Sequence, residues 1–375
     1  MITFNRPYLT GKELHYIRQA HRRAQLAGDG HFTEKCHRWL ESHLGTKKAL
    51  LTHSCTSALE MAAILAEIRP GDEVIMPSFT FVSTANAFVL RGAVPVFVDI
   101  RPDTLNLNET LVEKAITKKT RAIVPVHYAG VGCEMKAILA VSRHHGLLVI
   151  EDAAHCLGAT YRGRELGTFG DFGALSFHET KNIISGEGGT LLINSPDYLE
   201  RAEVVWQKGT NRRAFQNKKA SKYTWVDIGS SFLPGEITAA FLWAQLQSSS
   251  AINSRRKALW NHYFELFAEL EKAGKVRRPI VSPACSHNAH LFYLLLPTPS
   301  VRHQVIQQLR QAGIQAVFHY VPLHSSPAGR IWGRSSGKLP VTEKVSGTIL
   351  RLPFWVGLRH RTQIKILKII TSLLG

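Results

Sequence analysis

Several features are scarce or missing in this 375-residue chain, and each absence argues against a class of protein. The five cysteines are scattered and form no CxxC pair, which argues against a disulfide framework and a zinc site and predicts a reducing compartment. No apolar run approaches the roughly 18–20 residues of a membrane span. Residues 1–7 contain no apolar signal core. We therefore expect a cytoplasmic protein with no metal site and no membrane contact.

Acidic residues are also scarce, since 28 Asp and Glu stand against 46 Lys and Arg and leave a net charge of +18. Such a balance is typical of nucleic-acid-binding proteins. The cations, however, are spread along the chain in short clusters such as 212–213 and 218–219, and no zinc-finger, RNP1, basic-zipper or HExxH pattern occurs. We expect no nucleic-acid partner. A positive field would attract an anionic substrate, which accounts for only some of these cations.

The order of apolar segments predicts an α/β protein with a mostly parallel sheet. Between residues 49 and 200, short apolar runs alternate with helix-length segments, and such connections join parallel strands. The predicted strands include 74–76, 94–98, 122–126, 147–150, 174–177 and 190–193.

The length of the chain predicts two domains, because it exceeds one ordinary hydrophobic core. A long helix is predicted over 251–273, and we place the boundary at its start. This gives a large domain over 1–250 and a smaller α+β domain over 251–375. The smaller domain is predicted to contain strands over 290–296 and 315–321 and helices over 301–312 and 362–374.

Two polar residues lie beside short apolar runs and glycine loops. Asp152 follows the run 147–150, and Lys181 stands in the segment 176–182, just before a glycine loop at 185–189. A lysine amine can form a Schiff base with pyridoxal phosphate (PLP), and a carboxylate can keep its pyridine nitrogen protonated so that the ring accepts electrons. Either residue alone is more often a surface residue. Together with the next two elements, they predict a PLP site.

Small hydroxyl residues open the helix-like stretch that follows residues 49–51. Ser54, Thr56 and Ser57 stand at its start, where free N–H groups and the helix dipole suit a phosphate monoester. An ordinary helix cap has the same composition. Phe81 follows the next predicted strand, after Pro77, and could stack on a flat cofactor ring or pack in the core.

The collinear series of these segments resembles the DegT/DnrJ/StrS family of sugar aminotransferases, which are fold-type I PLP enzymes. The resemblance runs nearly end to end and includes residues 28–30, 51–56, 77–88, 126–130, 151–154, 176–182, 227–231 and 318–324. It implies an aspartate aminotransferase-like α/β fold with a smaller C-terminal domain. It also implies active sites at a subunit interface, in a homodimer or a dimer of dimers.

The resemblance implies a role for each candidate cofactor residue. Lys181 would bond to the cofactor and move the proton, Asp152 would pair with the pyridine nitrogen, and Phe81 would stack on the ring. The phosphate would be held by Thr56, Ser57 and Ser176. His155 stands where the family usually has glutamine near the cofactor 3-hydroxyl, and an imidazole can still donate one hydrogen bond there.

Other residues are implied to contact the substrate or a neighbouring subunit. Many members have an asparagine that reaches the neighbouring subunit's phosphate where this chain has Gly229, Ser230 and Ser231. The serine form resembles the subgroup that makes dTDP-4-amino-4,6-dideoxygalactose. Contacts with the sugar or its phosphates are expected from Asp29, His178, His319 and Tyr320, although histidines in a packed turn are as often structural.

The resemblance implies transfer of an amino group from glutamate to the 4-keto carbon of dTDP-4-keto-6-deoxyglucose, for surface polysaccharides such as enterobacterial common antigen and lipopolysaccharide. Three alternatives remain open. A 3-aminotransferase would share every cofactor residue. A PLP-dependent sugar dehydratase has histidine in place of the lysine, so Lys181 argues against it. A regulatory protein with this fold would carry a DNA-binding domain, and we expect none before residue 1.

Overall fold

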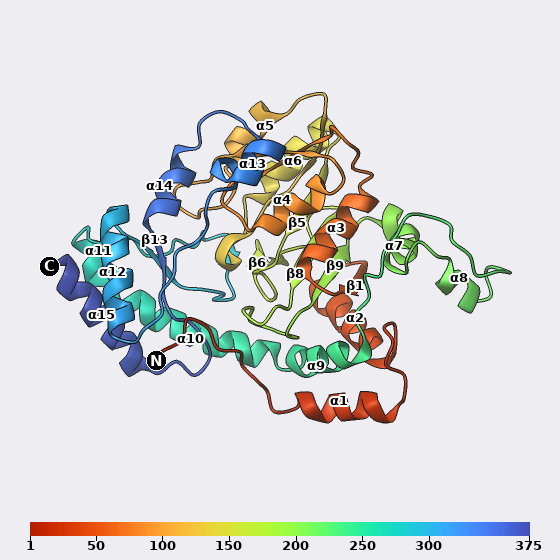
Figure 1. The fold of residues 1–375 in the computed structure, drawn as a ribbon, viewed down its shortest axis with the longest axis horizontal. Helices are drawn as coiled ribbons and strands as arrows, with labels where there is room; N and C mark the ends of the chain where they lie inside the picture. The colour runs from red at the N-terminus through yellow and green to blue at the C-terminus, as the bar shows by residue number, and fades with distance from the viewer.

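The computed structural model describes residues 1–375, and its largest element is an eight-stranded sheet in the order β1-β9-β8-β5-β4-β2-β3-β12 (Figure 1). Its strands are β1 (Lys48–Thr52), β2 (Glu73–Pro77), β3 (Val94–Val98), β4 (Thr120–Ile123), β5 (Leu148–Asp152), β8 (Phe172–Ser176), β9 (Gly189–Ile193) and β12 (Arg334–Ser335). Strand β9 runs antiparallel to both of its neighbours, and every other pair is parallel. The prediction of a mostly parallel sheet is confirmed.

The sheet has a hydrophobic core on each face. Adjacent residues of one strand enter different cores, as Leu50 and Leu51 or Val74 and Ile75 do, because side chains alternate across a strand. One core receives α2 (His31–Leu44), α6 (Met135–His145) and α9 (Glu236–Leu246), and the other receives α3 (Cys55–Leu65), α4 (Val82–Val89) and α7 (Leu199–Trp206). Strands covered on both faces read as continuous apolar runs, which is the pattern seen in the sequence.

A third core lies in the C-terminal part of the chain. It is built from α10 (Ser249–Leu266), α11 (Ala268–Lys272), α12 (Pro299–Gln311), α15 (His360–Leu374) and the antiparallel pair β11 (Tyr293–Leu295) and β13 (Ile349–Arg351). Helix α10 joins two cores, because Ile252 packs in the first and Leu259 in the third. The division into 1–250 and 251–375 stays a prediction. The N-terminal end of the chain contacts the predicted C-terminal domain, since Ile2 pairs with Ile314.

Smaller elements complete the fold. They are α1 (Glu13–Arg22), α5 (Val112–Ala115), α8 (Arg212–Gln216), α13 (Pro327–Trp332), α14 (Pro340–Thr348) and the short strands β6 (Thr160–Tyr161), β7 (Arg164–Glu165) and β10 (Cys285–Ser286). Helix α1 packs on α9, and α8 projects from the body of the molecule (Figure 1). None of the helices combines the length and the apolar character needed to cross a bilayer.

The structure corrects two predicted elements. The strand predicted over 315–321 is wrong, because that segment pairs only through an isolated bridge between Val317 and Arg351. The chain then leaves this bridge and brings His319 and Tyr320 into a cavity. The single helix predicted over 251–273 is interrupted at Phe267, where the backbone leaves helical geometry at ψ 7°.

Candidate active site

A cavity of about 420 Å³ lies at the carboxyl ends of the central strands. Asp152 ends β5 and Ser176 ends β8, while Phe81 follows β2 and Ser54 follows β1. Ligands bind at this edge of open α/β sheets. The opposite wall comes from distant parts of the chain and includes Phe4, His319, Tyr320 and Arg351.

Lys181 reaches the cavity from the loop between β8 and β9. Its backbone N–H donates to the carbonyl of His178 at 2.9 Å, which closes a turn before the glycine loop. Burial lowers the pKa of Lys181 to about 8, although the neighbouring Cys55 and Asp152 act in the opposite direction. The amine is therefore partly neutral near physiological pH, the form in which a lysine is a nucleophile or a base.

This lowered pKa predicts a pH dependence for covalent capture of PLP by the cofactor-free protein. Only the neutral amine attacks an aldehyde, so the initial rate should rise about tenfold per pH unit and level off above about pH 8. Stopped-flow absorbance measures this rate, with N-acetyl-lysine methylamide, whose amine has an ordinary pKa, as the control. A rate that still rises steeply well above pH 9 would contradict the lowered pKa.

Asp152 is held in one orientation toward the cavity. Its Oδ2 accepts a hydrogen bond from the Thr84 hydroxyl at 2.6 Å, and its Oδ1 accepts from the Ala154 N–H at 3.2 Å. Thr84 in turn lies 2.8 Å from the Thr80 hydroxyl. The residue is 6% exposed and lines the cavity, so its carboxyl group faces the cavity and not bulk water. Thr84 carried no signal of this role in the sequence, since it lies on the buried face of α4.

Hydroxyl groups gather at the N-terminus of α3. Thr56 Oγ1 lies 2.7 Å from Ser83 Oγ, and both residues line the cavity with Ser54 and Ser176. Ser57 does not line it, because its hydroxyl lies 3.1 Å from the Ser54 hydroxyl and its N–H donates to the same oxygen. Ser57 thus contributes to the helix cap, and Thr56, Ser83 and Ser176 bring hydroxyls to the cavity at the helix N-terminus, a place that suits an anion.

One glycine allows this arrangement. A Cβ on Gly189 would lie 2.4 Å from the backbone of Ser54 and Cys55, so the start of β9 approaches the start of α3 too closely for any side chain. The glycine loop after Lys181 therefore serves packing at this point, in addition to the turn that it makes.

An aromatic ring and a histidine line the same cavity as Lys181 and Asp152. Phe81 is 58% exposed and lines the cavity, so one face of its ring is available to a flat ligand. His155 Nδ1 accepts from the Ala129 N–H at 3.3 Å, which leaves the proton on Nε2. Burial lowers the pKa of His155 well below its ordinary value, and the ring stacks on His290 at 4.2 Å. His155 is thus a neutral donor.

Of the predicted substrate residues, the three from the later part of the chain lie in the cavity. His178 is fixed by Thr180, whose hydroxyl lies 2.9 Å from Nδ1. His319 Nδ1 lies 3.0 Å from the Tyr128 hydroxyl, and its ring packs on Tyr320 at 3.5 Å. Burial lowers the pKa of His319 and raises that of Tyr320.

The fourth predicted substrate residue, Asp29, does not line the cavity, and neither does Ser231, which the resemblance places near a neighbouring subunit's phosphate. Gln207 joins them, because its side-chain amide donates to Asp29 at 2.8 Å and its backbone pairs with Ser231. They lie at the base of the segment that carries α8. The structure thus brings these two residues together, and neither lines the cavity that contains Lys181.

Two cavity residues carried no signal in the sequence. Arg351 ends β13, and Phe4 belongs to the N-terminal segment. They meet only after folding, with the guanidinium carbon of Arg351 4.6 Å from the centre of the Phe4 ring.

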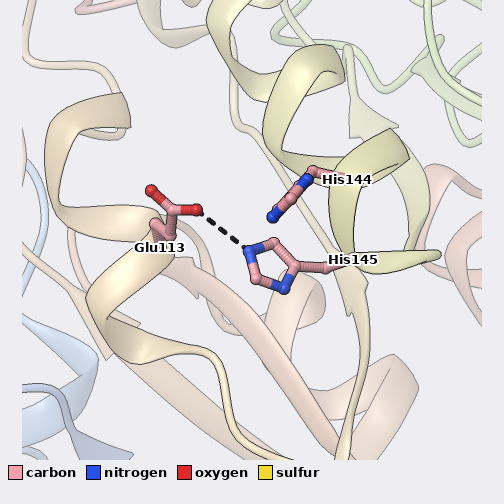
Figure 2. A group of neighbouring side chains, drawn as sticks. All are labelled: Glu113, His144 and His145. Carbon is pink, nitrogen blue, oxygen red and sulfur yellow. Dashed lines mark hydrogen bonds and ion pairs between the residues drawn. The ribbon is translucent and has the colours of Figure 1, made fainter.

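A group of potential metal ligands lies outside the cavity, on α5 and α6 (Figure 2). His145 Nε2 lies 3.0 Å from Glu113 Oε1, and the ligating atoms of these residues and His144 lie within 4.8 Å of one another. All three residues are exposed. The contact is a surface pair at the C-terminus of α6.

The cavity residues fit PLP as a set. Thr56, Ser83 and Ser176 would hold its phosphate at the start of α3, Asp152 would pair with its pyridine nitrogen, and Lys181 would bind it covalently. The bound cofactor would supply a ring that accepts negative charge from a substrate carbon. The roles of the individual residues stay predictions.

Comparison with known proteins decides the family. The model of the DegT/DnrJ/EryC1/StrS aminotransferase family matches residues 7–371. The chain belongs to this family. The predictions of an aminotransferase, of a fold-type I architecture and of pyridoxal 5'-phosphate as cofactor are confirmed.

The relatives cover almost the whole chain. GDP-perosamine synthase from Caulobacter vibrioides is 34% identical over 373 residues, 98% of this chain and 96% of that protein. The dTDP-4-dehydro-2,3,6-trideoxy-D-glucose 4-aminotransferase of Saccharopolyspora spinosa is 32% identical over 360 residues, 94% of this chain and 91% of that protein. Among solved structures, the PMP form of Spr1654 from Streptococcus pneumoniae has a TM-score of 0.92 at 26% identity, covering 100% of this chain and 99% of that one. Its PLP form has a TM-score of 0.90.

Proposed function

We propose that this aminotransferase moves an amino group from L-glutamate to the 4-keto carbon of a nucleotide-linked 4-keto-6-deoxy sugar. The observation that carries the proposal is the shared cavity of Lys181 and Asp152 at the sheet edge, in a chain of the sugar aminotransferase family. Two relatives are a GDP-perosamine synthase and a dTDP-sugar 4-aminotransferase, which supports amination of nucleotide sugars.

The specific substrate that we propose is dTDP-4-keto-6-deoxyglucose, converted to dTDP-4-amino-4,6-dideoxygalactose. The serine pair Ser230-Ser231 supports this choice, through the subgroup that the sequence resembles. The expected use of the product is surface polysaccharide such as enterobacterial common antigen. The cytoplasmic location stays a prediction.

Lys181 is the group suited to move a proton at the substrate carbon. A general acid or base works best when its pKa lies near the operating pH, and burial brings the pKa of Lys181 to about 8. His178, His319 and Tyr320 would orient the sugar in the same cavity. The stereochemistry of the product depends on which face of the keto carbon they direct toward Lys181.

We also propose that two copies of the chain pack together through the segment that carries α8. This segment projects from the body of the molecule (Figure 1). It exposes large apolar side chains to between 43% and 78%, namely Phe215, Tyr223, Trp225, Val226 and Ile228. Exposed apolar patches of this kind mark protein interfaces. When two copies bind through this segment, Asp29 and Ser231 of one copy would lie near the cavity of the other. This is the role that the resemblance implies for Ser231.

The test of the function is the structure of the product. The holoenzyme should be incubated with L-[15N]glutamate and, in parallel, with dTDP-, UDP- and GDP-linked 4-keto-6-deoxy sugars, with the Lys181→Ala variant as control. We expect the dTDP sugar to react and NMR to locate an axial amine at carbon 4. An equatorial amine, or an amine at carbon 3, would contradict the proposed substrate and leave the aminotransferase assignment standing.

A further inference from the structure

His290 is a buried histidine of the cavity, and its hydrogen bonds fix which ring nitrogen carries the proton. Its Nδ1 lies 3.0 Å from Asn182 Oδ1. The amide nitrogen of Asn182 donates to Asn253 Oδ1 at 2.9 Å and to the carbonyl of Asn288 at 2.8 Å. The atom of Asn182 that faces the ring is therefore its oxygen, which only accepts. The proton of His290 must lie on Nδ1, and Nε2 keeps its lone pair.

The neighbouring ring of His155 carries the opposite tautomer. Its Nδ1 accepts from the Ala129 N–H, so its proton lies on Nε2. The two rings stack with their centres 4.2 Å apart and their planes at 24°. Burial lowers the pKa of both histidines well below the ordinary value. The stacked pair therefore consists of two neutral rings, of which His155 offers a donor and His290 an acceptor.

Lys181 is the donor that suits this acceptor. Both residues line the large cavity, and both border a second cavity of only about 10 Å³. They lie close enough for the charge of Lys181 to lower the pKa of His290. Asn182, which holds the His290 ring, follows Lys181 directly in the chain. Neither the Lys181 amine nor His290 Nε2 makes a hydrogen bond within the chain, so each is free to take the other as a partner.

We propose that His290 is a positioning residue for Lys181, an inference that rests on the proposed function. Its Nε2 would accept a hydrogen bond from the lysine amine whenever that amine is not bonded to the cofactor. An amine that donates one N–H to Nε2 keeps its lone pair for the proton of the substrate carbon. Holding the flexible lysine stem in one orientation favours that transfer. His155 cannot serve in this way, because its Nε2 is already protonated.

Two substitutions separate the roles of the two ring nitrogens. His290→Asn places an amide N–H near the position of Nδ1 and can keep the bond to Asn182, but it leaves no atom at Nε2. His290→Gln brings an amide oxygen to the position of Nε2 and gives up the bond to Asn182. The matched control is His287→Asn, since the His287 ring packs on Trp260 at 4.4 Å and lies outside the cavity.

The first measurement uses the holoenzyme with L-glutamate alone, followed by stopped-flow absorbance. His290→Asn should slow this half-reaction on the order of tenfold, because one hydrogen bond contributes about 1–1.5 kcal/mol. The isotope effect of [2-2H]glutamate should rise, since a poorly oriented amine makes the proton transfer slower than the other steps. His290→Gln should lose less than about threefold, and His287→Asn should match wild type.

The second measurement uses the cofactor-free protein and does not depend on turnover. A hydrogen-bond acceptor favours the charged amine, so its loss should lower the pH midpoint of PLP capture by roughly 0.5–1 unit in His290→Asn. His290→Gln should keep the wild-type midpoint, which lies near the pKa of Lys181, about 8. A purely structural defect would lower the melting temperature and leave this midpoint in place.

The pattern across the variants decides the proposal. Wild-type behaviour of a folded His290→Asn, or equal losses in His290→Asn and His290→Gln, would overturn it, because the acceptor at Nε2 would then be dispensable. If His290→Asn fails to melt cooperatively, His290→Phe replaces it, since phenylalanine keeps a ring and removes both nitrogens. Failure of the proposed function is separable, because neither measurement contains a keto-sugar. An enzyme that aminates no keto-sugar would still show the difference between the two variants.

Discussion

Lys181→Ala is expected to lower the turnover of amino transfer on the order of 10⁴-fold or more, because it removes both the covalent attachment of the cofactor and the group that moves the proton. The variant should still retain PLP without a covalent bond, since the hydroxyls of Thr56, Ser83 and Ser176 and the N-terminus of α3 remain. Turnover and the cofactor content after gel filtration measure the two effects separately.

The matched control for this variant is Lys338→Ala. Lys338 is exposed and lies outside the cavity, so its loss should change neither turnover nor cofactor content. Near-normal turnover of Lys181→Ala would contradict the role of Lys181. Complete loss of PLP from a folded variant would contradict the proposed phosphate site instead.

Asp152→Asn is expected to cost roughly 10³-fold or more in turnover while the fold remains intact. The amide oxygen can still accept the hydrogen bond from Thr84 at the position of Oδ2, and the amide nitrogen at the position of Oδ1 loses only the longer bond from the Ala154 N–H. A neutral amide cannot keep the pyridine nitrogen protonated, and the ring then accepts negative charge poorly. PLP affinity should fall by about 1–3 kcal/mol, the range for a lost charge-assisted hydrogen bond.

The control for Asp152→Asn is Thr84→Val, which removes the hydroxyl bonded to Oδ2 and keeps the carboxylate. Thr84→Val should lower turnover far less, on the order of tenfold, because one hydrogen bond contributes about 1 kcal/mol. Steady-state kinetics and thermal melting of both variants measure the comparison. Equal losses in the two variants would indicate that geometry, and not the charge of Asp152, dominates.

The sequence predicted the wall of the cavity that the sheet provides. Asp152, Ser176 and Phe81 each end or follow a buried strand, and the carboxyl ends of parallel strands meet at one edge. The continuous apolar runs identified those strands, because both faces of the sheet are covered. Residues of this kind can be located from local patterns and from the order of elements.

The opposite wall could not be predicted in the same way. Phe4 and Arg351 lie at opposite ends of the chain and meet only through packing of the C-terminal part. The segment 315–321 has the composition of a strand, but only Val317 finds a bridge, and the rest turns into the cavity. Thr84 supports Asp152 from the buried face of a helix, where a threonine is ordinarily a core residue.

The most direct test of the account is the site of covalent attachment of PLP. The holoenzyme should be reduced with borohydride, digested and analysed by mass spectrometry, with the Lys181→Ala variant treated in parallel. We expect the pyridoxyl group on the peptide that contains Lys181 and no labelled peptide in the variant. A label on another lysine of the wild-type protein, or no label on the Lys181 peptide, would contradict the central claim.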